Sequence, residues 1–370
     1  MKYYIIAGEA SGDLHGSNLM KALLNVDSVA NIRFWGGDLM GNVGGTLVKH
    51  YKERAFMGFV EVITNLYKIF KDISFCKDDI SAFNPDVIIF IDNSGFNLRI
   101  AKWAKAAGFK TNYYISPQVW ASRASRVKAI KRDIDAMYVI LPFVKPFYEK
   151  HGYKVTFVGH PLIDAIANRT QVDDLIFREQ YQLGEKPIIA LLPGSRKQEI
   201  SKMLSVMLSL VDQYPEYQFV IAGAPSQDYS FYKTFIKATN VKFIDNKTYD
   251  LLSISTAALV TSGTATLETA LFKVPQVVCY KGSAISYHIA KRIITLKFIS
   301  LVNLVMDREV VTELIQNDFN KKRLKKELDN ILDAENRKKI FTDYYELENA
   351  LGGKGASEKT AKLIYKSLKS

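Results

Sequence analysis

The chain has 370 residues, of which 48% are hydrophobic and 24% are charged, and its formal net charge is +12 at pH 7. This balance is that of an ordinary globular protein, and it excludes a disordered chain, a collagen-like repeat and a disulfide-rich scaffold. At about 150 residues per domain, the length predicts two domains. The excess of lysine and arginine favours an anionic partner, such as nucleic acid, an anionic membrane surface or a phosphorylated substrate.

The cysteine content and the length of the apolar runs indicate the cellular compartment of the protein. Cys76 and Cys279 lie far apart in the sequence, which fits a reducing cytosol and neither a disulfide framework nor a cysteine zinc site. The first apolar run, Tyr3–Ala7, is too short for a signal peptide. No stretch reaches the ~18 uncharged apolar residues of a membrane-spanning helix. We therefore expect a cytosolic protein, with attachment to a membrane surface left open. The histidines form no H-x-x-x-H pair, so no metal is expected.

Short, continuously apolar runs alternate with helical patterns along most of the chain. Strands are predicted at 3–7, 87–92, 111–115, 136–141 and 154–158, and then at 188–192, 218–222, 241–244, 257–261 and 276–280. Continuous apolar strands are typical of a parallel sheet with helices on both faces. The pattern therefore predicts an α/β chain of two doubly wound, Rossmann-like domains, residues 1–165 and 166–355, that face a cleft. The last helix, about 356–370, is expected to pack on the first domain or on a neighbouring copy, so the oligomeric state, a homodimer included, stays open.

The first strand runs into a glycine-rich turn, Gly8–Gly16. Its glycines recur every four residues, so it matches neither the G-x-G-x-x-G dinucleotide fingerprint nor a Walker A loop. Glu9, Asp13 and His15 lie in this turn, and titratable groups at the carboxyl end of a strand are well placed for proton transfer. A turn of this kind is also common in such folds without a chemical role.

Two segments of the second half follow a strand and begin a helix. Pro193–Arg196 presents backbone N–H groups at a helix N-terminus, where Arg196 can pair with a diphosphate. Thr261–Glu268 begins another helix with small hydroxyl residues, and Glu268 lies where a carboxylate can accept both hydroxyls of a ribose. An ordinary turn and a well-capped helix are the alternatives, but together the two segments favour nucleotide binding. The residues expected to contact the nucleotide are Gly194, Ser195, Arg196, Ser262, Gly263, Thr264, Ala265 and Glu268.

An apolar segment at helical spacing occupies residues 55–70. Such a helix is often simply core, but Met57, Val62 and Ile69 at its non-core positions are apolar too and leave little polar face, which favours contact with a membrane or with acyl chains. The residues concerned are Phe56, Met57, Phe59, Val60, Ile63, Leu66, Tyr67 and Phe70. A basic run follows, with nine lysines and arginines and no acid between Arg99 and Arg132. It lacks the signatures of nucleic-acid-binding folds, so no nucleic-acid partner is expected.

The order and spacing of the motifs resemble those of the lipid-A-disaccharide synthases, which are inverting glycosyltransferases of the two-domain GT-B fold. The resemblance runs nearly end to end. It is carried by the segments 7–13, 56–58, 116–121, 141–143, 158–161, 191–196, 262–268 and 300–304. It implies a reaction of UDP-2,3-diacylglucosamine with 2,3-diacylglucosamine 1-phosphate (lipid X) in lipid A biosynthesis, without a metal ion or other cofactor. It also implies peripheral attachment to the cytoplasmic face of the inner membrane.

The resemblance extends to individual site residues, with one departure. It implies that UDP binds the second half with Asn303 nearby, and that Ser11, Asp13 and Asn97 contact substrate in the first half. Many members carry I-D-x-P-D-F-N, whose second aspartate is the leading candidate for the general base, whereas this chain has Gly95 at that position. We therefore expect the base to be Asp92, Glu9 or His15, and Asp92 is preferred because it ends a strand.

Two other functions fit part of this pattern. A UDP-sugar 2-epimerase would share the nucleotide motifs but would have no use for an acyl-binding helix. A non-catalytic membrane tether that binds UDP-sugar lipids is favoured only if Gly95 reflects lost activity.

Overall fold

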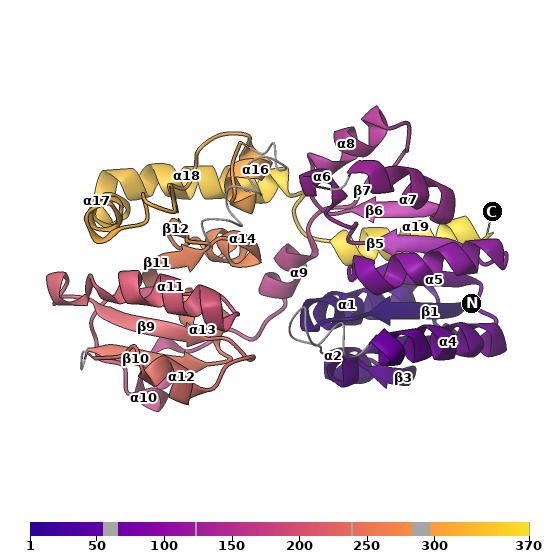
Figure 1. Ribbon diagram of the computed structural model, residues 1–370, viewed down its shortest axis with the longest axis horizontal. Helices are drawn as coiled ribbons and strands as arrows, with labels where there is room; N and C mark the ends of the chain where they lie inside the picture. Colours follow the sequence, from indigo (N-terminus) through magenta and orange to yellow (C-terminus); the bar gives the residue numbers. More distant parts are fainter. Residues whose placement is uncertain (55–65, 123, 238–239, 283–296, 370) are drawn as a thin grey trace. The chain divides into compact units, whose positions relative to one another are not determined.

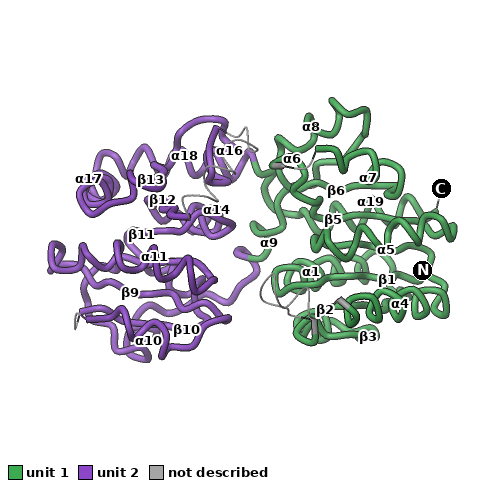
Figure 2. The backbone as a smooth tube through the Cα atoms, viewed as in Figure 1, with its two compact units in different colours: residues 1–165, 351–370 green, residues 166–350 purple. Residues whose placement is uncertain are grey.

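The computed structural model describes residues 1–54, 66–122, 124–237, 240–282 and 297–369 (Figure 1). The chain forms two compact units. Residues 1–165 and 351–370 make up unit 1, and residues 166–350 make up unit 2 (Figure 2). Within the described ranges, no helix is both long and apolar enough to cross a lipid bilayer.

Unit 1 is built on a seven-stranded parallel sheet with the strand order β3-β2-β1-β4-β5-β6-β7. The strands are β1 (Lys2–Ala7), β2 (Asn31–Gly36), β3 (Thr46–His50), β4 (Val87–Ile91), β5 (Thr111–Tyr114), β6 (Ala136–Val139) and β7 (Thr156–Phe157). In the central strand β1, Ile5 pairs with Phe34 on one side and with Ile89 on the other. All three side chains are fully buried. A parallel sheet covered on both faces explains why these strands are apolar without alternation.

The helices of unit 1 are α1 (Ala10–Val26), α2 (Asp38–Gly41), α4 (Leu66–Phe83), α5 (Ser94–Ala106), α6 (Val119–Ser122), α7 (Val127–Asp133), α8 (Val144–Lys150), α9 (Pro161–Ala167) and α19 (Ala356–Lys369). Leu19 and Leu23 of α1 share one core with Ala361 and Ile364 of α19. Helix α4 contacts α5, and α5 contacts α7. The last helix of the chain thus belongs to the unit that holds the first strand.

Unit 2 has a six-stranded parallel sheet with the order β10-β9-β8-β11-β12-β13. Its strands are β8 (Ile188–Leu192), β9 (Gln218–Gly223), β10 (Val241–Asp245), β11 (Ser255–Thr261), β12 (Gln276–Tyr280) and β13 (Glu313–Ile315). Its helices are α10 (Asp174–Gln180), α11 (Lys197–Leu208), α12 (Tyr229–Lys233), α13 (Thr248–Ser253), α14 (Thr264–Leu271), α16 (Leu301–Met306), α17 (Lys321–Leu332) and α18 (Ala334–Ala350).

Strand β8 shows how both faces of this sheet are covered. Ile189 and Leu191 belong to one hydrophobic core, whereas Ile188, Ala190 and Leu192 belong to the other. Successive side chains of a strand point to opposite faces, so an unbroken apolar run supplies two cores at once. The predicted α/β class with two parallel sheets is therefore confirmed.

Candidate functional site

The carboxyl ends of β1, β4 and β5 bring the first group of expected residues together in unit 1. A Cβ atom on Gly8, after β1, would lie 1.9 Å from Nδ2 of Asn93, after β4, so a larger residue there would force the Asn93 side chain to move. Asp92 and Asn93 have φ angles of +44° and +42°, and Ile115, after β5, has +63°. Left-handed conformations of residues other than glycine cost about 1–3 kcal/mol each and cluster at active sites and ligand clamps. Three residues with a strained backbone therefore lie at this edge of the sheet.

Asp92 is a candidate base whose carboxyl pKa departs clearly from its ordinary value. Burial, and after it the negative charge of Glu9, raise the pKa of Asp92 to about 6. The backbone oxygen of Asp92 accepts hydrogen bonds from the Tyr113 hydroxyl and from Nδ2 of Asn97. These contacts hold the strained residue in place. A carboxylate whose pKa lies near neutrality is suited to general-base catalysis.

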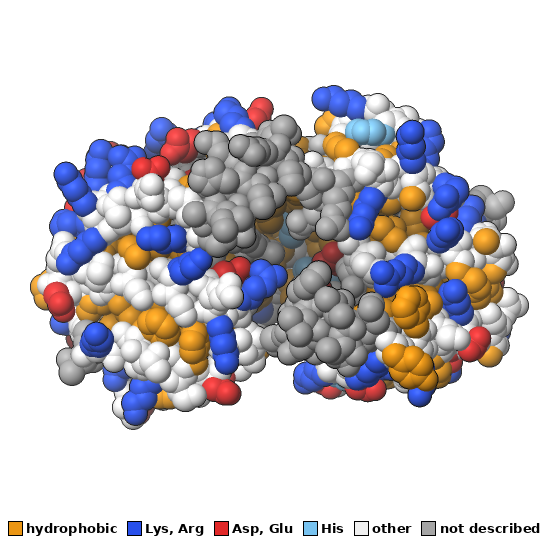
Figure 3. Space-filling view, viewed as in Figure 1, with side chains coloured by type: hydrophobic (Ala, Val, Ile, Leu, Met, Phe, Trp, Pro, Cys, Tyr) orange, Lys and Arg blue, Asp and Glu red, His pale blue; other side chains and the backbone are white. Residues whose placement is uncertain are grey.

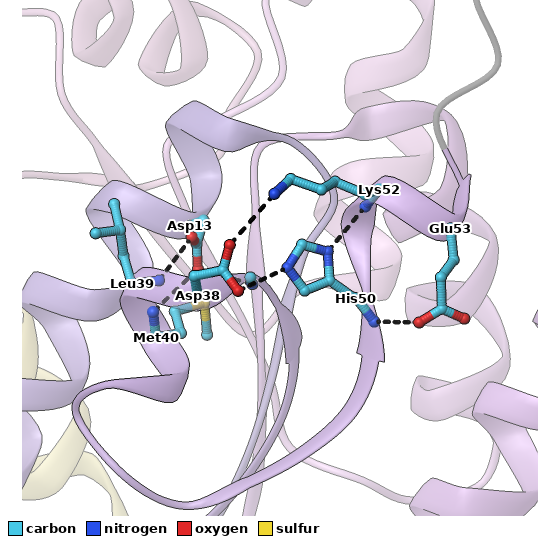
Figure 4. Close-up of polar contacts among 8 residues, drawn as sticks. Asp13, Asp38, Leu39, Met40, His50, Lys52 and Glu53 are labelled. Atoms are coloured by element: carbon cyan, nitrogen blue, oxygen red, sulfur yellow. Dashed lines mark hydrogen bonds and ion pairs between the residues drawn. The ribbon is translucent and has the colours of Figure 1, made fainter.

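The side chains of Asn97 and Asp13 are buried, and both form hydrogen bonds with backbone groups of the chain. The Asn97 amide donates to the carbonyls of Ile91 and Asp92, at 3.1 and 2.8 Å, and so secures the end of β4. The Asp13 carboxylate accepts from the backbone N–H groups of Gly37, Leu39 and Met40, the last two of which are drawn in Figure 4, at 2.7–3.0 Å. The structure gives both side chains a positioning role, and their contact with substrate stays a prediction.

His15 lies on α1 with its Nδ1 buried and without a hydrogen-bond partner among the described residues. Burial lowers its pKa to about 4. His160 is also buried, its Nδ1 accepts from the backbone N–H of Leu162, and burial together with His15 lowers its pKa to about 3. Both imidazoles are therefore neutral at pH 7. Glu9 and Ser11 are exposed at the start of the same helix.

A cavity of about 620 Å³ lies beside β3 and the first turns of α4. Its lining mixes aromatic side chains with cations and two acids, namely Val48, Lys49, Glu53, Tyr67, Lys68, Lys71, Asp72 and Phe75. Lys49 forms an ion pair with Asp72. Tyr67 is 82% exposed and Phe70 is 62% exposed, which is unusual for side chains of this size.

Most of the residues expected to bind acyl chains fall outside the described ranges. Phe56, Met57, Phe59, Val60 and Ile63 lie outside the described residues, and of Leu66 only its place at the start of α4 is described. On the visible face of unit 1, lysine and arginine side chains are interspersed with apolar ones (Figure 3).

In unit 2, the turn after β8 leads into α11. Gly194 has a φ of +103°, and a Cβ atom there would lie 2.9 Å from Oε2 of Glu199. The Ser195 carbonyl accepts from the Ser226 hydroxyl at 2.7 Å. Arg196 caps α11, is 81% exposed, and pairs with Glu199 at 3.0 Å. An exposed pair of this kind is weak, so the Arg196 guanidinium is available to an incoming anion.

The turn after β11 begins α14 in a similar way. Gly263 caps the helix, and Thr264 is exposed in its first turn, with Ala265 half-buried beside it. The Ser262 hydroxyl donates to the Ile299 carbonyl at 3.0 Å. Farther along the helix, Oε1 of Glu268 accepts from the Tyr249 hydroxyl at 2.9 Å, and burial raises the Glu268 pKa.

Asn303 uses its whole hydrogen-bonding capacity within the chain. Its Oδ1 accepts from the N–H groups of Val310 and Val311, and its Nδ2 donates to the Val311 carbonyl and to Oε1 of Glu313. Glu313 also accepts from the N–H groups of Ile299 and Ser300 at 2.9 Å. Asn303 and Glu313 therefore shape the segment before α16, and a direct contact between Asn303 and UDP stays a prediction.

Sequence reasoning missed a second cavity, of about 290 Å³, in unit 2. It lies at the carboxyl ends of β9 and β10 and is lined by Pro225, Asn246, Lys247, Thr248, Tyr249 and Asp250. In doubly wound sheets, ligands bind beyond the carboxyl ends of strands. No motif points to these residues, because a short polar turn followed by a tyrosine is an ordinary loop pattern. Among the described residues, no group of three or more histidines, cysteines, aspartates and glutamates could hold a metal ion.

Solved structures share this fold at low sequence identity. A Staphylococcus aureus MnaA–UDP structure matches with a TM-score of 0.71 and 15% identity over 100% of this chain and 97% of that one. A UDP-GlcNAc 2-epimerase from Neisseria meningitidis bound to UDP-GlcNAc matches with a TM-score of 0.68 and 13% identity, over 100% of this chain and 99% of that one. A glycosyltransferase of kitacinnamycin matches with a TM-score of 0.64 and 12% identity, over 99% of this chain and 98% of that one. The fold is thus that of UDP-sugar epimerases and GT-B-like glycosyltransferases.

Sequence relatives are much closer. The protein named lipid-A-disaccharide synthase from Geobacter metallireducens is 38% identical over 98% of this chain and 96% of its own length. The protein of the same name from Syntrophus aciditrophicus is 39% identical over 96% of this chain and 95% of its own length. The model of the family described as lipid-A-disaccharide synthetase matches residues 3–366. The chain belongs to the lipid-A-disaccharide synthase family.

Proposed function

We propose that this protein is a lipid-A-disaccharide synthase. It transfers the sugar of UDP-2,3-diacylglucosamine to the 6-hydroxyl of 2,3-diacylglucosamine 1-phosphate and releases UDP and a β-1,6-linked disaccharide phosphate. The observation that carries the proposal is the family match over residues 3–366. The likeness to the UDP-GlcNAc 2-epimerase from Neisseria meningitidis rests on 13% identity and supports a common fold, not a common reaction.

Unit 2 is the proposed donor-binding unit. The N-termini of α11 and α14 present backbone N–H groups, which favour phosphate. Arg196 can leave its exposed pair with Glu199 and form a forked contact with the diphosphate. These groups would stabilise the charge that develops on the leaving UDP. The proposal therefore includes a reaction that needs no metal ion.

Unit 1 supplies the proposed base. The Asp92 carboxylate takes the proton of the acceptor 6-hydroxyl as its oxygen attacks the anomeric carbon of the donor. The bond from that carbon to the diphosphate breaks in the same step, on the opposite side, so the configuration inverts. Strain at Asp92 and Asn93, and a pKa of about 6 for Asp92, support the assignment. This base would replace the aspartate whose place Gly95 occupies.

The first turns of α4 are the proposed contact with lipid. Exposed Tyr67 and Phe70 offer apolar area to acyl chains, and Lys68 and Lys71 are exposed in the same turns. Each such cation near an anionic bilayer contributes about 1 kcal/mol to binding. We therefore place the protein on the cytoplasmic face of the inner membrane as a peripheral protein.

A turnover assay in detergent tests this function directly. Both acylated substrates are supplied with EDTA, and the disaccharide phosphate is detected by mass. Product formed in EDTA would support the donor, the acceptor and the lack of a metal requirement. Conversion of soluble UDP-GlcNAc to its 2-epimer, with no disaccharide from the acylated pair, would replace the synthase with an epimerase.

A further inference from the structure

Tyr249 joins two features of unit 2 that the sequence does not connect. It lies on α13, after β10, and its hydroxyl donates to Oε1 of Glu268 on α14 at 2.9 Å. The same residue lines the 290 Å³ cavity at the carboxyl ends of β9 and β10. The hydrogen bond therefore connects the wall of this cavity to the carboxylate that is expected to bind ribose.

The tyrosine ring is itself held in place. It packs on Phe272, with ring centroids 5.4 Å apart, and the Arg169 guanidinium lies 5.0 Å from the centroid of the Phe272 ring. Arg169 also forms an ion pair with Asp250 of α13 at 3.2 Å. A hydroxyl on an immobilised ring therefore donates its hydrogen bond from a fixed position. A flexible polar side chain would not hold its donor in one place.

We infer that Tyr249 is a positioning residue for donor binding, which orients Glu268 so that its second oxygen, Oε2, faces the ribose of the nucleotide. The inference rests on the proposed function. Tyr249 is the one hydrogen-bond donor to Glu268 in the described part of unit 2, and no described residue donates to Oε2. A glutamate that is already oriented loses less side-chain freedom when the nucleotide binds.

The hydrogen bond also affects the charge of Glu268. Burial raises the Glu268 pKa, whereas the Tyr249 hydroxyl opposes that change by stabilising the carboxylate. An ionised carboxylate can accept from both ribose hydroxyls, and a protonated one has lost part of that capacity. Lys247 precedes α13 and Asp250 lies on it; these two charged groups pair with each other, and Asp250 also pairs with Arg169.

The test substitutes Tyr249→Phe, which keeps the ring and removes the hydroxyl. We expect the affinity for UDP, measured by calorimetry, to fall about tenfold, the size of one hydrogen bond to a charged group. The donor KM should rise while kcat changes little, because the bond acts on binding. The pH below which UDP affinity declines should move upward. A purely structural role would leave that pH unchanged.

Tyr214→Phe is the matched control. The Tyr214 hydroxyl donates to Oδ1 of Asp329 at 2.6 Å. Tyr214 follows the short helix Val211–Gln213 and Asp329 lies on α17, so this tyrosine–carboxylate bond is in the same unit but involves neither α13 nor α14. It should lower thermal stability to an extent similar to Tyr249→Phe and leave UDP affinity unchanged. Equal losses of UDP affinity in both variants would overturn the inference.

A double-mutant cycle with Glu268→Ala completes the test. If Tyr249 acts through Glu268, Tyr249→Phe has no further effect once the carboxylate is gone. The inference is wrong if Tyr249→Phe binds UDP like the wild type, or if its effect is the same with and without Glu268. Wild-type turnover of the acylated substrates is measured alongside, so that a failure of the synthase assignment is seen separately.

Discussion

Asp92 carries two marks of a functional residue at the scale of a single side chain, a strained backbone and a carboxyl group with a pKa of about 6. Asp92→Asn keeps the shape of the side chain and removes the base. We expect kcat to fall by about 10²–10⁴, the usual contribution of a general base. Thermal melting checks that the variant is folded. A folded Asp92→Asn protein with near-normal kcat would return the assignment to Glu9 or His15.

The pH dependence of turnover follows from the same residue. Asp92 must be deprotonated to act, so kcat/KM should decline as the pH falls through about 6. Glu9→Gln removes one of the two causes of the raised pKa, and the decline should then occur at lower pH. Burial is the larger cause and remains, so the midpoint should stay above the ordinary aspartate value of about 3.9. A pH–rate profile of both proteins checks this, and an unchanged midpoint would argue against a charge effect of Glu9 on the base.

The free energy of unfolding should change with pH in the direction opposite to kcat/KM. Because the Asp92 pKa is higher in the folded chain than in the unfolded chain, the folded state binds more protons between about pH 4 and 6. The free energy of unfolding therefore contains a contribution that decreases as the pH rises through this window. Asp92→Asn should show a smaller decrease than the wild type when both are unfolded in urea at pH 4.5 and pH 7. Identical pH dependence would mean that Asp92 is not titrating there.

The sequence predicts some of these residues and not their contacts. The glycine-rich turn and the two helix starts are readable because glycine and small hydroxyl residues follow directly after apolar strands. The partners of Asp13 are Gly37 and two residues of α2, and those of Asn303 include Glu313 of β13. Contacts between separate elements depend on how these elements pack, which no local pattern encodes. Tyr249 was missed for the same reason.

At the scale of elements, the proposed contact of α4 with lipid rests on two exposed aromatic residues, Tyr67 and Phe70. Replacing Tyr67 and Phe70 together with serine should weaken binding to vesicles that contain anionic lipid by about tenfold or more, because each large apolar side chain contributes about 1.5–3 kcal/mol on full burial. Sedimentation with the vesicles measures this. The control is the pair Leu175 and Ile176 on α10, which are 79% and 64% exposed in unit 2, replaced in the same way. An equal loss in both pairs would mean that apolar exposure alone, and not α4, drives binding.

The strands that sequence reasoning missed share a physical cause. β2 and β3 each contain a charged residue inside the strand, Arg33 and Lys49, and the three-residue β13 begins with a charged residue, Glu313. Arg33 and Lys49 pair with Asp79 and Asp72 of α4, and Glu313 accepts three donors from the segment before and within α16. Each charge is satisfied by a residue from another element. Most of the predicted strands have unbroken apolar runs; β10 was predicted although Lys242 interrupts it.

At the scale of the whole molecule, Asp164 binds the last segment of the chain, residues 351–370, to the rest of unit 1. Its carboxylate accepts from the backbone N–H groups of Gly355 and Ser357, at 2.7 and 3.3 Å, at the start of α19. Asp164→Ala should lower the melting temperature and make the last helix sensitive to limited proteolysis, followed by mass. The cost should reach about 2 kcal/mol, the upper end for the loss of a helix cap. Asp173→Ala removes a local cap of α10 and should leave the last helix protected.

The return of the chain to unit 1 also sets the order in which the two units can be finished during synthesis. Unit 2 is complete once residue 350 has left the ribosome, whereas unit 1 must wait for residues 351–370. Until then, the surface of α1 that contains Leu19 and Leu23 lacks the cover that Ala361 and Ile364 provide. Domains commonly fold in the order in which they emerge. In this protein the unit translated first becomes whole last, and a stop codon near the end of the gene would damage the unit that carries Asp92 while sparing the one that carries Arg196 and Glu268.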